Sequence, residues 1–135
     1  MNYTIDKTHI DQLTSEQKQK LQELYPPKIG QKIITGKTGK NYVVKEIMRD
    51  GKLYVGSFKT WPSNVFPVLN ENELIHSLVL VCSSIEMGHY KNNVVDDVVY
   101  PTWDITVTDA LDGYYYEGET LLEVLWEAYK EIILG

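Results

Sequence analysis

The C-terminal third of the chain constrains the fold most tightly. Residues 103–108 alternate apolar and polar side chains, with Trp103, Ile105 and Val107 on one face, which is the two-residue period of a half-buried strand. A turn at 109–113 leads into three consecutive tyrosines. We interpret this block as a β-hairpin.

A helix is predicted directly after this hairpin. Thr120 and Glu123 have the spacing of a capping box, in which each side chain bonds a backbone amide of the other residue. The polar side chains that mark a solvent-facing side of this helix are Glu123, Glu127, Lys130 and Glu131. The apolar surface that remains is so wide that it must pack on a sheet and on a second element.

The first half of the chain predicts a helix followed by a small meander. Thr14 and Gln17 form a further capping box, and the helix should end near Leu24 or Tyr25, before the proline pair at 26–27. Three short strands joined by turns then follow, because the apolar period changes to two. The strands are predicted at 32–35, 41–48 and 52–58, the turns at 36–40 and 50–51, and a proline-punctuated connection at 61–67.

The middle of the chain predicts another helix. Asn70 or Asn72 can cap it, and apolar residues recur at helical spacing over 74–85. The run 78–81 would also suit a buried strand, and we choose the helix. Residues 88–93 are then expected to form a loop, and 94–100 an extended segment that stops at Pro101.

These elements place the chain in the α+β class. We expect an N-terminal helix, a small antiparallel β-meander, a middle helix, and a C-terminal β-hairpin with a helix packed on the sheet. At 135 residues the chain fits a single domain spanning 1–135.

Charge divides this predicted domain into two sub-lobes. Residues 1–60 carry eleven Lys and Arg against six Asp and Glu, and residues 61–135 carry two against thirteen, so the net charge of −6 separates into +5 and −11. Such asymmetry indicates either two lobes that dock on each other or a face prepared for a charged partner.

No pattern in the sequence is typical of catalysis or metal binding. The segment Gly36-Lys37-Thr38 lacks the earlier glycine and the following helix of a phosphate-binding loop. The histidines at 9, 76 and 89 and Cys82 share no metal-ligand spacing. We expect no enzyme, no metal and no cofactor; a weak cation site on the acidic hairpin and a hydrolase with separated carboxylates are the alternatives.

The sequence also predicts a cytoplasmic protein without membrane contact. The longest apolar run, 78–82, is far shorter than the roughly 18 residues that cross a bilayer. The N-terminus shows no basic region followed by an apolar core, and one cysteine makes no internal disulfide.

Aromatic and basic residues supply two sets of candidate binding residues. Ten Tyr and three Trp suggest protein contacts, because these side chains are enriched at binding hot spots, although they also fill cores. The protein-binding candidates are Trp61, Tyr114, Tyr116, Glu117 and Glu119. The candidates for nucleic-acid binding are Lys32, Lys37, Lys40, Lys45 and Lys52. Arg49 is the single Arg, which disfavours specific reading of DNA bases.

The C-terminal block resembles the end of HicB-type antitoxin domains. Residues 113–125 read Gly-Tyr-Tyr-Tyr-Glu-Gly-Glu-Thr-Leu-Leu-Glu-Val-Leu, similar to the family's extended edge, its Gly-[Asp/Glu]-Thr-Leu-x-Glu-Ala signature and its helix, with Val124 in place of Ala. The block and the leading segment 13–30 also resemble small proteins of phages and prophages of Gram-positive bacteria. The resemblance implies an antitoxin-like regulator and assigns no functional residue.

The leading hypothesis is therefore a non-catalytic cytoplasmic protein of phage or prophage type that binds another protein or a second copy of itself. Nucleic-acid binding by the basic meander is the alternative.

Overall fold

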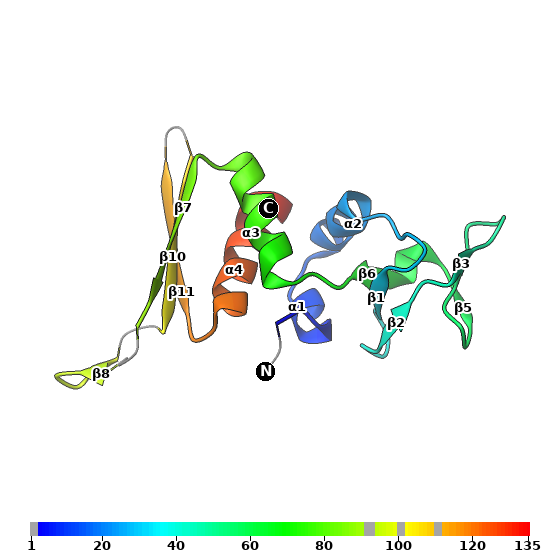
Figure 1. Ribbon diagram of the computed structural model, residues 1–135, viewed down its shortest axis with the longest axis horizontal. Coiled ribbons are helices and arrows are strands. Elements are labelled where there is room, and N and C mark those ends of the chain that lie inside the picture. The colour runs from blue at the N-terminus through cyan, green and yellow to red at the C-terminus, as the bar shows by residue number, and fades with distance from the viewer. Residues whose placement is uncertain (1–2, 91–93, 100–101, 110–111) are drawn as a thin grey trace. The chain divides into compact units, whose positions relative to one another are not determined.

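The computed structural model describes residues 3–90, 94–99, 102–109 and 112–135 (Figure 1). Contacts divide the chain into two compact units, Thr4–Leu69 (the N-terminal unit) and Asn70–Gly135 (the C-terminal unit), the latter joined by Tyr3. Positions 61–69 hold no charged residue, so the N-terminal unit carries the +5 and the C-terminal unit the −11. Helices and antiparallel sheets occur in both halves of the chain, which confirms the α+β class. The single domain over 1–135 stays a prediction.

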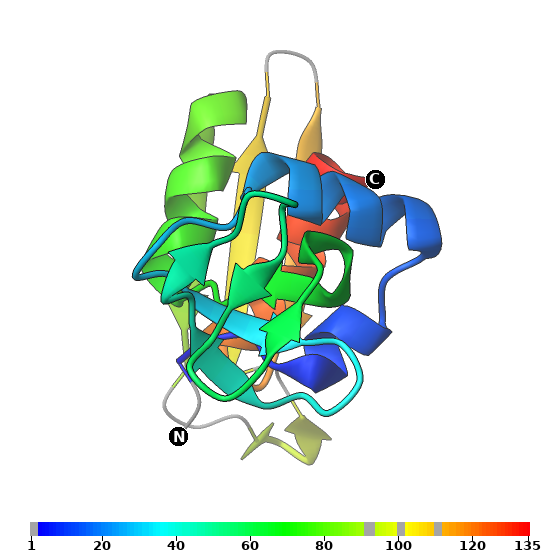
Figure 2. The ribbon, with the colours of Figure 1, turned by 90° about the vertical axis from the view of Figure 1, so that its right-hand side faces the viewer.

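The N-terminal unit begins with helices and continues as a meander (Figure 2). Its elements are α1 (Lys7–Asp11), α2 (Ser15–Leu24), β1 (Lys32–Thr35), β2 (Asn41–Val43), β3 (Glu46–Ile47), β4 (Leu53–Tyr54), β5 (Lys59–Thr60), the 3₁₀ helix η1 (Pro62–Asn64) and β6 (Val65–Pro67). The strands form two antiparallel sheets, ordered β2-β1-β6 and β3-β4-β5. The strand order β3-β4-β5 is that of a meander, whereas β1 lies between β2 and β6 in the other sheet.

The capping box predicted for α2 is confirmed. The Thr14 hydroxyl accepts a hydrogen bond from the Gln17 amide at 3.2 Å, and the Gln17 side-chain oxygen accepts one from the Thr14 amide at 2.9 Å. Leu21 is fully buried, and α2 packs on η1 and β6. The short helix α1, which the sequence pattern did not predict, is capped by Asp6, whose carboxylate accepts from the Thr8 amide at 2.9 Å.

The predicted strand 41–48 is wrong as a single element, because the backbone changes partner inside it. The Val44 amide donates to Gln31, whereas the Lys45 amide donates to Tyr54 of β4. The run 41–48 thus contributes β2 to one small sheet and β3 to the other. Its break leaves Val44 buried in the core, beside Ile33.

Two further expectations for the meander are corrected. The predicted strand 52–58 pairs only over Leu53–Tyr54, because the chain turns at Gly56, where φ is +94°. The stretch 61–67 is not a plain connection, since it forms η1 and then β6. Strand β6 pairs with β1 and forms one edge of the sheet.

The C-terminal unit contains one larger sheet with helices on one side. Its elements are α3 (Glu71–Val81), β7 (Ser84–His89), β8 (Val94–Val95), β9 (Val98–Val99), β10 (Trp103–Thr108), β11 (Gly113–Gly118), α4 (Leu121–Tyr129) and the π-helical η2 (Lys130–Leu134). The sheet is antiparallel with β10 in the centre, ordered β11-β10-β7. The hairpin formed by β10 and β11 confirms the prediction for this region.

The middle helix is confirmed only in its first part. Asn70 caps it, and Cys82 ends it with extended backbone angles of −117° and 154°. Residues 84–89 form strand β7 rather than helix and loop, because they pair along the whole length of β10. Residues 91–93 of the expected loop lie outside the described part of the chain.

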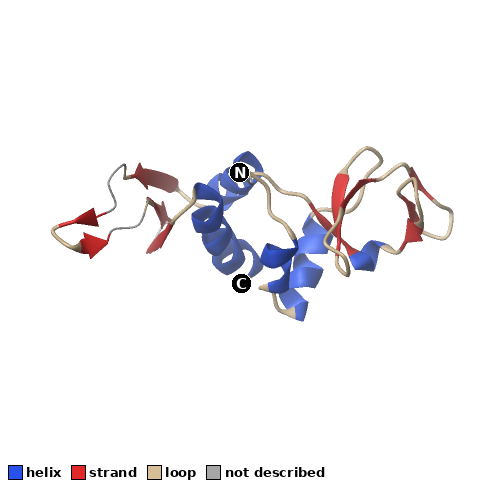
Figure 3. Cartoon of the chain, turned by 90° about the horizontal axis from the view of Figure 1, so that it is seen from below, coloured by secondary structure: helices blue, strands red, loops and turns tan. Residues whose placement is uncertain are grey.

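The extended segment predicted at 94–100 is instead a small hairpin of β8 and β9 (Figure 3). Asp96 and Asp97 have positive φ values of 50° and 63°, and they reverse the chain between the two strands. Tyr100 and Pro101, where the segment was expected to end, lie outside the described residues.

The last helix packs as predicted on a sheet and on a second element. Ile105 and Val107 are fully buried on the face of the sheet that α4 covers, and α4 contacts β10, β11 and α3. The Thr120 hydroxyl accepts from the Glu123 amide at 3.2 Å, which confirms Thr120 as the cap. Trp126 and Tyr129 on the inner side of α4 stack with ring centroids 5.7 Å apart.

Candidate binding surfaces

The outer face of the C-terminal sheet is open. Its residues alternate with Ile105 and Val107, so on β10 they are Asp104, Thr106 and Thr108. Both α3 and α4 lie on the other side of this sheet (Figure 1). Six residues on this side, including Tyr90 directly after β7, form what we call the acidic face: Glu86, Tyr90, Asp104, Thr106, Tyr115 and Glu117. None of the described residues of β7, β10 or β11 is Lys or Arg.

Two carboxylates of the acidic face stand directly opposite each other. Asp104 of β10 pairs in register with Glu117 of β11, and like charges in this position destabilise a sheet. On its other side, Asp104 pairs with Gly88. A Cβ at Gly88 would collide with the Asp104 carboxylate, so this glycine leaves the space in which the carboxylate lies.

Tyrosine hydroxyls bridge the two carboxylates. The Tyr115 hydroxyl lies 3.1 Å from Glu117 Oε2 and 3.3 Å from Asp104 Oδ2, and the Tyr90 hydroxyl donates to Asp104 Oδ2 at 2.8 Å. One hydroxyl hydrogen cannot satisfy two carboxylates at once, and a carboxylate has room for several donors. The pair therefore retains accepting capacity for a cationic donor from outside.

The phenols of this network stay protonated. Loss of water contact raises the pKa of Tyr115, and Glu117 and Asp104 raise it further, to about 12. The hydrogen bond to Asp104 raises the pKa of Tyr90, and the charge of Asp104 adds to it. Both hydroxyls therefore act as donors near neutral pH, while the aromatic rings stay accessible, with Tyr115 57% and Tyr90 43% exposed.

The structure places the predicted tyrosines on the other side of the sheet. Tyr114 and Tyr116 pair with Val107 and Ile105 on the face that α4 covers, and both are half-buried. The charge of Asp109 raises the pKa of Tyr114, and burial raises that of Tyr116. The exposed ring of the run is Tyr115, which the sequence-based choice omitted.

The two predicted glutamates lie in different places. Glu117 belongs to the acidic face. Glu119 is exposed and follows β11, in the bend that leads to Thr120 and α4. Glu86, which the sequence did not single out, and Asp104, which it considered only as part of a weak cation site on the acidic hairpin, complete the face. The signal for both is their alternation with apolar residues in the paired strands.

The N-terminal unit carries a second surface of opposite charge, on the sheet β3-β4-β5. The ammonium group of Lys52 lies 5.0 Å from the centre of the Trp61 ring, within the range of a cation–π interaction. Tyr54 and Lys59 are paired in register on the same side as these two residues. We call Lys52, Tyr54, Lys59 and Trp61 the aromatic–lysine surface. Trp61 is 46% exposed.

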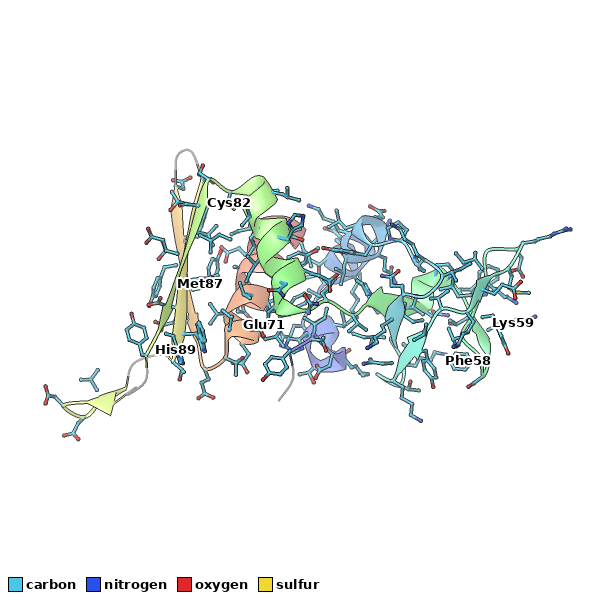
Figure 4. The ribbon with its side chains drawn as sticks, in the orientation of Figure 1. Phe58, Lys59, Glu71, Cys82, Met87 and His89 are labelled. Carbon is cyan, nitrogen blue, oxygen red and sulfur yellow. The ribbon has the colours of Figure 1, made fainter. Side chains whose placement is uncertain are left out.

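Phe58 lies next to Lys59 at the beginning of β5 (Figure 4). It is partly exposed, and its ring meets the Tyr42 ring edge-on, with centroids 5.0 Å apart. The structure thus brings together Trp61 and Lys52, which the sequence had assigned to two different hypotheses.

The other predicted lysines do not form one cluster. Lys37 and Lys40 lie at the turn between β1 and β2, and Lys32 is the first residue of β1. Lys45 directly precedes β3, and its side chain lies beside Gly56 in the turn between β4 and β5.

A groove in the N-terminal unit separates the end of α2 from β6. Its volume is about 260 Å³, slightly below the range of small-molecule sites. The Gln22 amide donates to the carbonyls of Ser63 and Val65, at 3.0 Å each, and closes one wall. The apolar lining consists mainly of Tyr25, Pro26, Pro27, Pro62, Phe66 and Pro67.

Histidine and cysteine side chains have local partners. His89 stacks on Trp103 with ring centroids 4.2 Å apart, and burial together with the charge of Asp109 raises the pKa of Cys82. Among the described residues, no group of three or more His, Cys, Asp or Glu side chains is arranged to hold a metal ion. No helix in the described part of the chain has the length and apolar character needed to cross a membrane.

No protein-family model, curated protein or solved structure matches this chain. The function must therefore be inferred from the two surfaces themselves.

Proposed function

We propose that this protein is a non-catalytic binding protein whose acidic face takes a segment of another protein that carries Lys or Arg. The observation that carries the proposal is the opposed pair of Asp104 and Glu117 on an uncovered sheet face. Such a pair costs folding stability in the free protein, and a cation placed between the two carboxylates removes that cost.

The chemistry of the face favours a basic side chain as the occupant. An arginine guanidinium presents parallel N–H donors that suit two neighbouring carboxylates. The exposed rings of Tyr90 and Tyr115 add flat apolar surface and attract cations to their faces. Exposed tyrosines beside charged groups are also typical of residues that dominate binding energy.

Two kinds of partner could supply the basic segment. One is a different protein, and the other is the N-terminal unit of a second copy of this chain, with its net charge of +5. Attraction between exposed charges weakens as salt is added, so we expect either complex to be salt-sensitive.

The experiment compares two charge-matched double variants. Asp104→Asn with Glu117→Gln removes the opposed pair, and Glu123→Gln with Glu127→Gln removes two exposed carboxylates of α4. Binding of a short oligoarginine peptide is measured by calorimetry, and tagged protein is used to capture partners with and without nuclease. The first variant should lose the peptide and any nuclease-resistant partner, and the second should keep both.

Equal binding by the two variants would overturn the proposal, because it would show attraction to net charge alone. Phage or prophage origin, a cytoplasmic location and an antitoxin-like role remain predictions from the sequence. A stoichiometric partner identified by mass spectrometry would test them.

A further inference from the structure

We propose that the aromatic–lysine surface of the N-terminal unit binds single-stranded nucleic acid, by stacking a base on Trp61 and neutralising adjacent phosphates with Lys52 and Lys59. This surface is separate from the acidic face and belongs to the other compact unit. The proposal therefore stands or falls independently of the proposed function.

The Trp61 ring is exposed, and the backbone that carries it is held in place. Its carbonyl accepts a hydrogen bond from the Asn64 amide at 3.0 Å, and Pro62 follows it as the first residue of η1. Proline restricts the backbone at this point. A backbone fixed in this way loses little conformational freedom when a base stacks on the ring.

Two lysines lie on the same side of the sheet as the ring. Lys52 lies over the ring, 5.0 Å from its centre, and Lys59 is paired with Tyr54 on that side. Glu46 is the acidic residue of this side, opposite Tyr54. The carboxylate of Asp50 accepts from the Lys52 amide at 3.0 Å and is thereby held in its turn. Cations beside an exposed aromatic ring are the combination that single-strand binders use.

Single strands fit this surface better than duplexes or acidic peptides. A base can stack on a protein ring only when it is unpaired. Duplex reading in the major groove relies on bidentate side chains, above all Arg, and this chain has only Arg49. An acidic peptide would use the lysines but would gain nothing from the flat face of Trp61.

The test uses ligands that separate stacking from charge. Fluorescence anisotropy at low salt measures binding of the full-length protein to a labelled oligothymidylate of about ten nucleotides, to an abasic strand of the same length, and to polyglutamate. The variants are Trp61→Leu, Trp61→Phe, Lys52→Gln and, as a matched charge control, Lys20→Gln on the exposed side of α2.

We expect the wild type to prefer oligothymidylate over the abasic strand and over polyglutamate. Trp61→Leu should weaken binding to oligothymidylate about tenfold and leave the abasic strand unaffected, while Trp61→Phe retains most of the binding. Lys52→Gln should reduce the slope of log K against log salt by about 0.7, the contribution of one phosphate on a single strand. Lys20→Gln should change neither quantity.

Three results would overturn the proposal. These are oligothymidylate binding that survives Trp61→Leu, equal affinity for the abasic strand, or equal affinity for polyglutamate, which would indicate an acidic protein as the ligand. Circular dichroism of the Trp61 variants shows whether the fold is kept, and Trp61→Phe preserves an aromatic ring if Trp61→Leu unfolds. Because the acidic face is intact in all these variants, oligoarginine binding should be unchanged.

Discussion

Asp104 and Glu117 illustrate, at the scale of single residues, how a sheet accommodates an unfavourable pair. Their carboxylates face each other across β10 and β11, and the hydroxyls of Tyr90 and Tyr115 are the donors that offset part of the repulsion. Both tyrosines that supply these donors are exposed. The stability of the sheet and the proposed binding therefore involve the same four side chains.

Replacing Tyr115 by Phe removes the shared donor and should lower the free energy of unfolding. The folded pKa of Tyr115, about 12, lies above its usual value of about 10. Above pH 10 the unfolded phenol ionises first, so the stabilisation is complete below pH 10 and is lost as the pH rises towards 12. Urea unfolding of both proteins should show a difference that is constant below pH 10 and shrinks above it.

The ultraviolet absorbance of tyrosinate provides the direct check. The wild type should contain a phenol titrating near pH 12 that is missing from Tyr115→Phe. In Asp104→Asn, the Tyr115 phenol should titrate at a lower pH than in the wild type. An unchanged titration in both variants would contradict the hydrogen-bond network.

The tyrosine run shows why the sequence could not identify the exposed ring. Alternation predicts that residues 114–116 point to both faces of the sheet, and the structure confirms it. Which ring points outward depends on the register, here Thr108 opposite Gly113, and a slip by one residue would reverse the faces. The sequence pattern does not determine that register, so Tyr115 was missed.

At the scale of elements, signals between close neighbours in sequence predicted the structure well. The caps at Thr14, Asn70 and Thr120 are all confirmed, because a cap needs only a side chain and an amide three residues away. Long-range pairing was not predictable in this way. The helical spacing that extends to Ile85 is overridden beyond Cys82, because β7 gains a full set of hydrogen bonds with β10.

The two asparagines at the start of α3 offer a test of the cap. The Asn70 side chain accepts from the Glu73 amide at 2.8 Å, and the Glu73 side chain accepts from the Asn70 amide at 3.2 Å. Asn70→Ala should therefore cost about 1 kcal/mol of stability. Asn72→Ala, inside the first turn, should be neutral or slightly stabilising, because Ala has the higher helix propensity.

Chemical denaturation of the two variants distinguishes the residues that the sequence left as alternatives. Equal losses would contradict the assignment of Asn70 as the cap. A larger loss at Asn72 would mean that the helix begins two residues later.

Leucines on opposite sides of α3 test how this helix packs. Leu78 is fully buried, whereas Leu80 is 71% exposed, and α3 packs against α4 and β7. Leu78→Ala should cost about 2–5 kcal/mol through lost burial and a residual cavity. Leu80→Ala should stay within about 0.5 kcal/mol of the wild type.

Thermal and urea unfolding measure both substitutions. Comparable losses would show that Leu80 is covered in solution, by a partner or a second copy. Concentration dependence of the Leu80→Ala effect would then identify self-association.

At the scale of the whole molecule, the charge boundary and the boundary between the units coincide. The uncharged stretch 61–69 ends the N-terminal unit. The net charge of +5 therefore lies in the N-terminal unit and the net charge of −11 in the C-terminal unit, and each unit has its own hydrophobic core. The core of the N-terminal unit includes Ile33, Val44 and Leu53, and that of the C-terminal unit is built on Ile105 and Val107. Each charged surface is thus supported by its own core.

This separation predicts that the two binding activities can be removed one at a time. Asp104→Asn with Glu117→Gln should abolish oligoarginine binding and leave oligothymidylate binding unchanged, and Trp61→Leu should do the reverse. The free-energy effects of substitutions at sites with no shared partners add within about 0.5 kcal/mol. In the variant that combines all three substitutions, the loss of binding free energy for oligoarginine should therefore equal that of the Asp104→Asn, Glu117→Gln variant. The loss for oligothymidylate should equal that of Trp61→Leu. Calorimetric titration of each ligand is then repeated in the presence of the other ligand. If one ligand changes the binding free energy of the other by more than about 1 kcal/mol, the two surfaces are not independent, because independent sites give no such coupling.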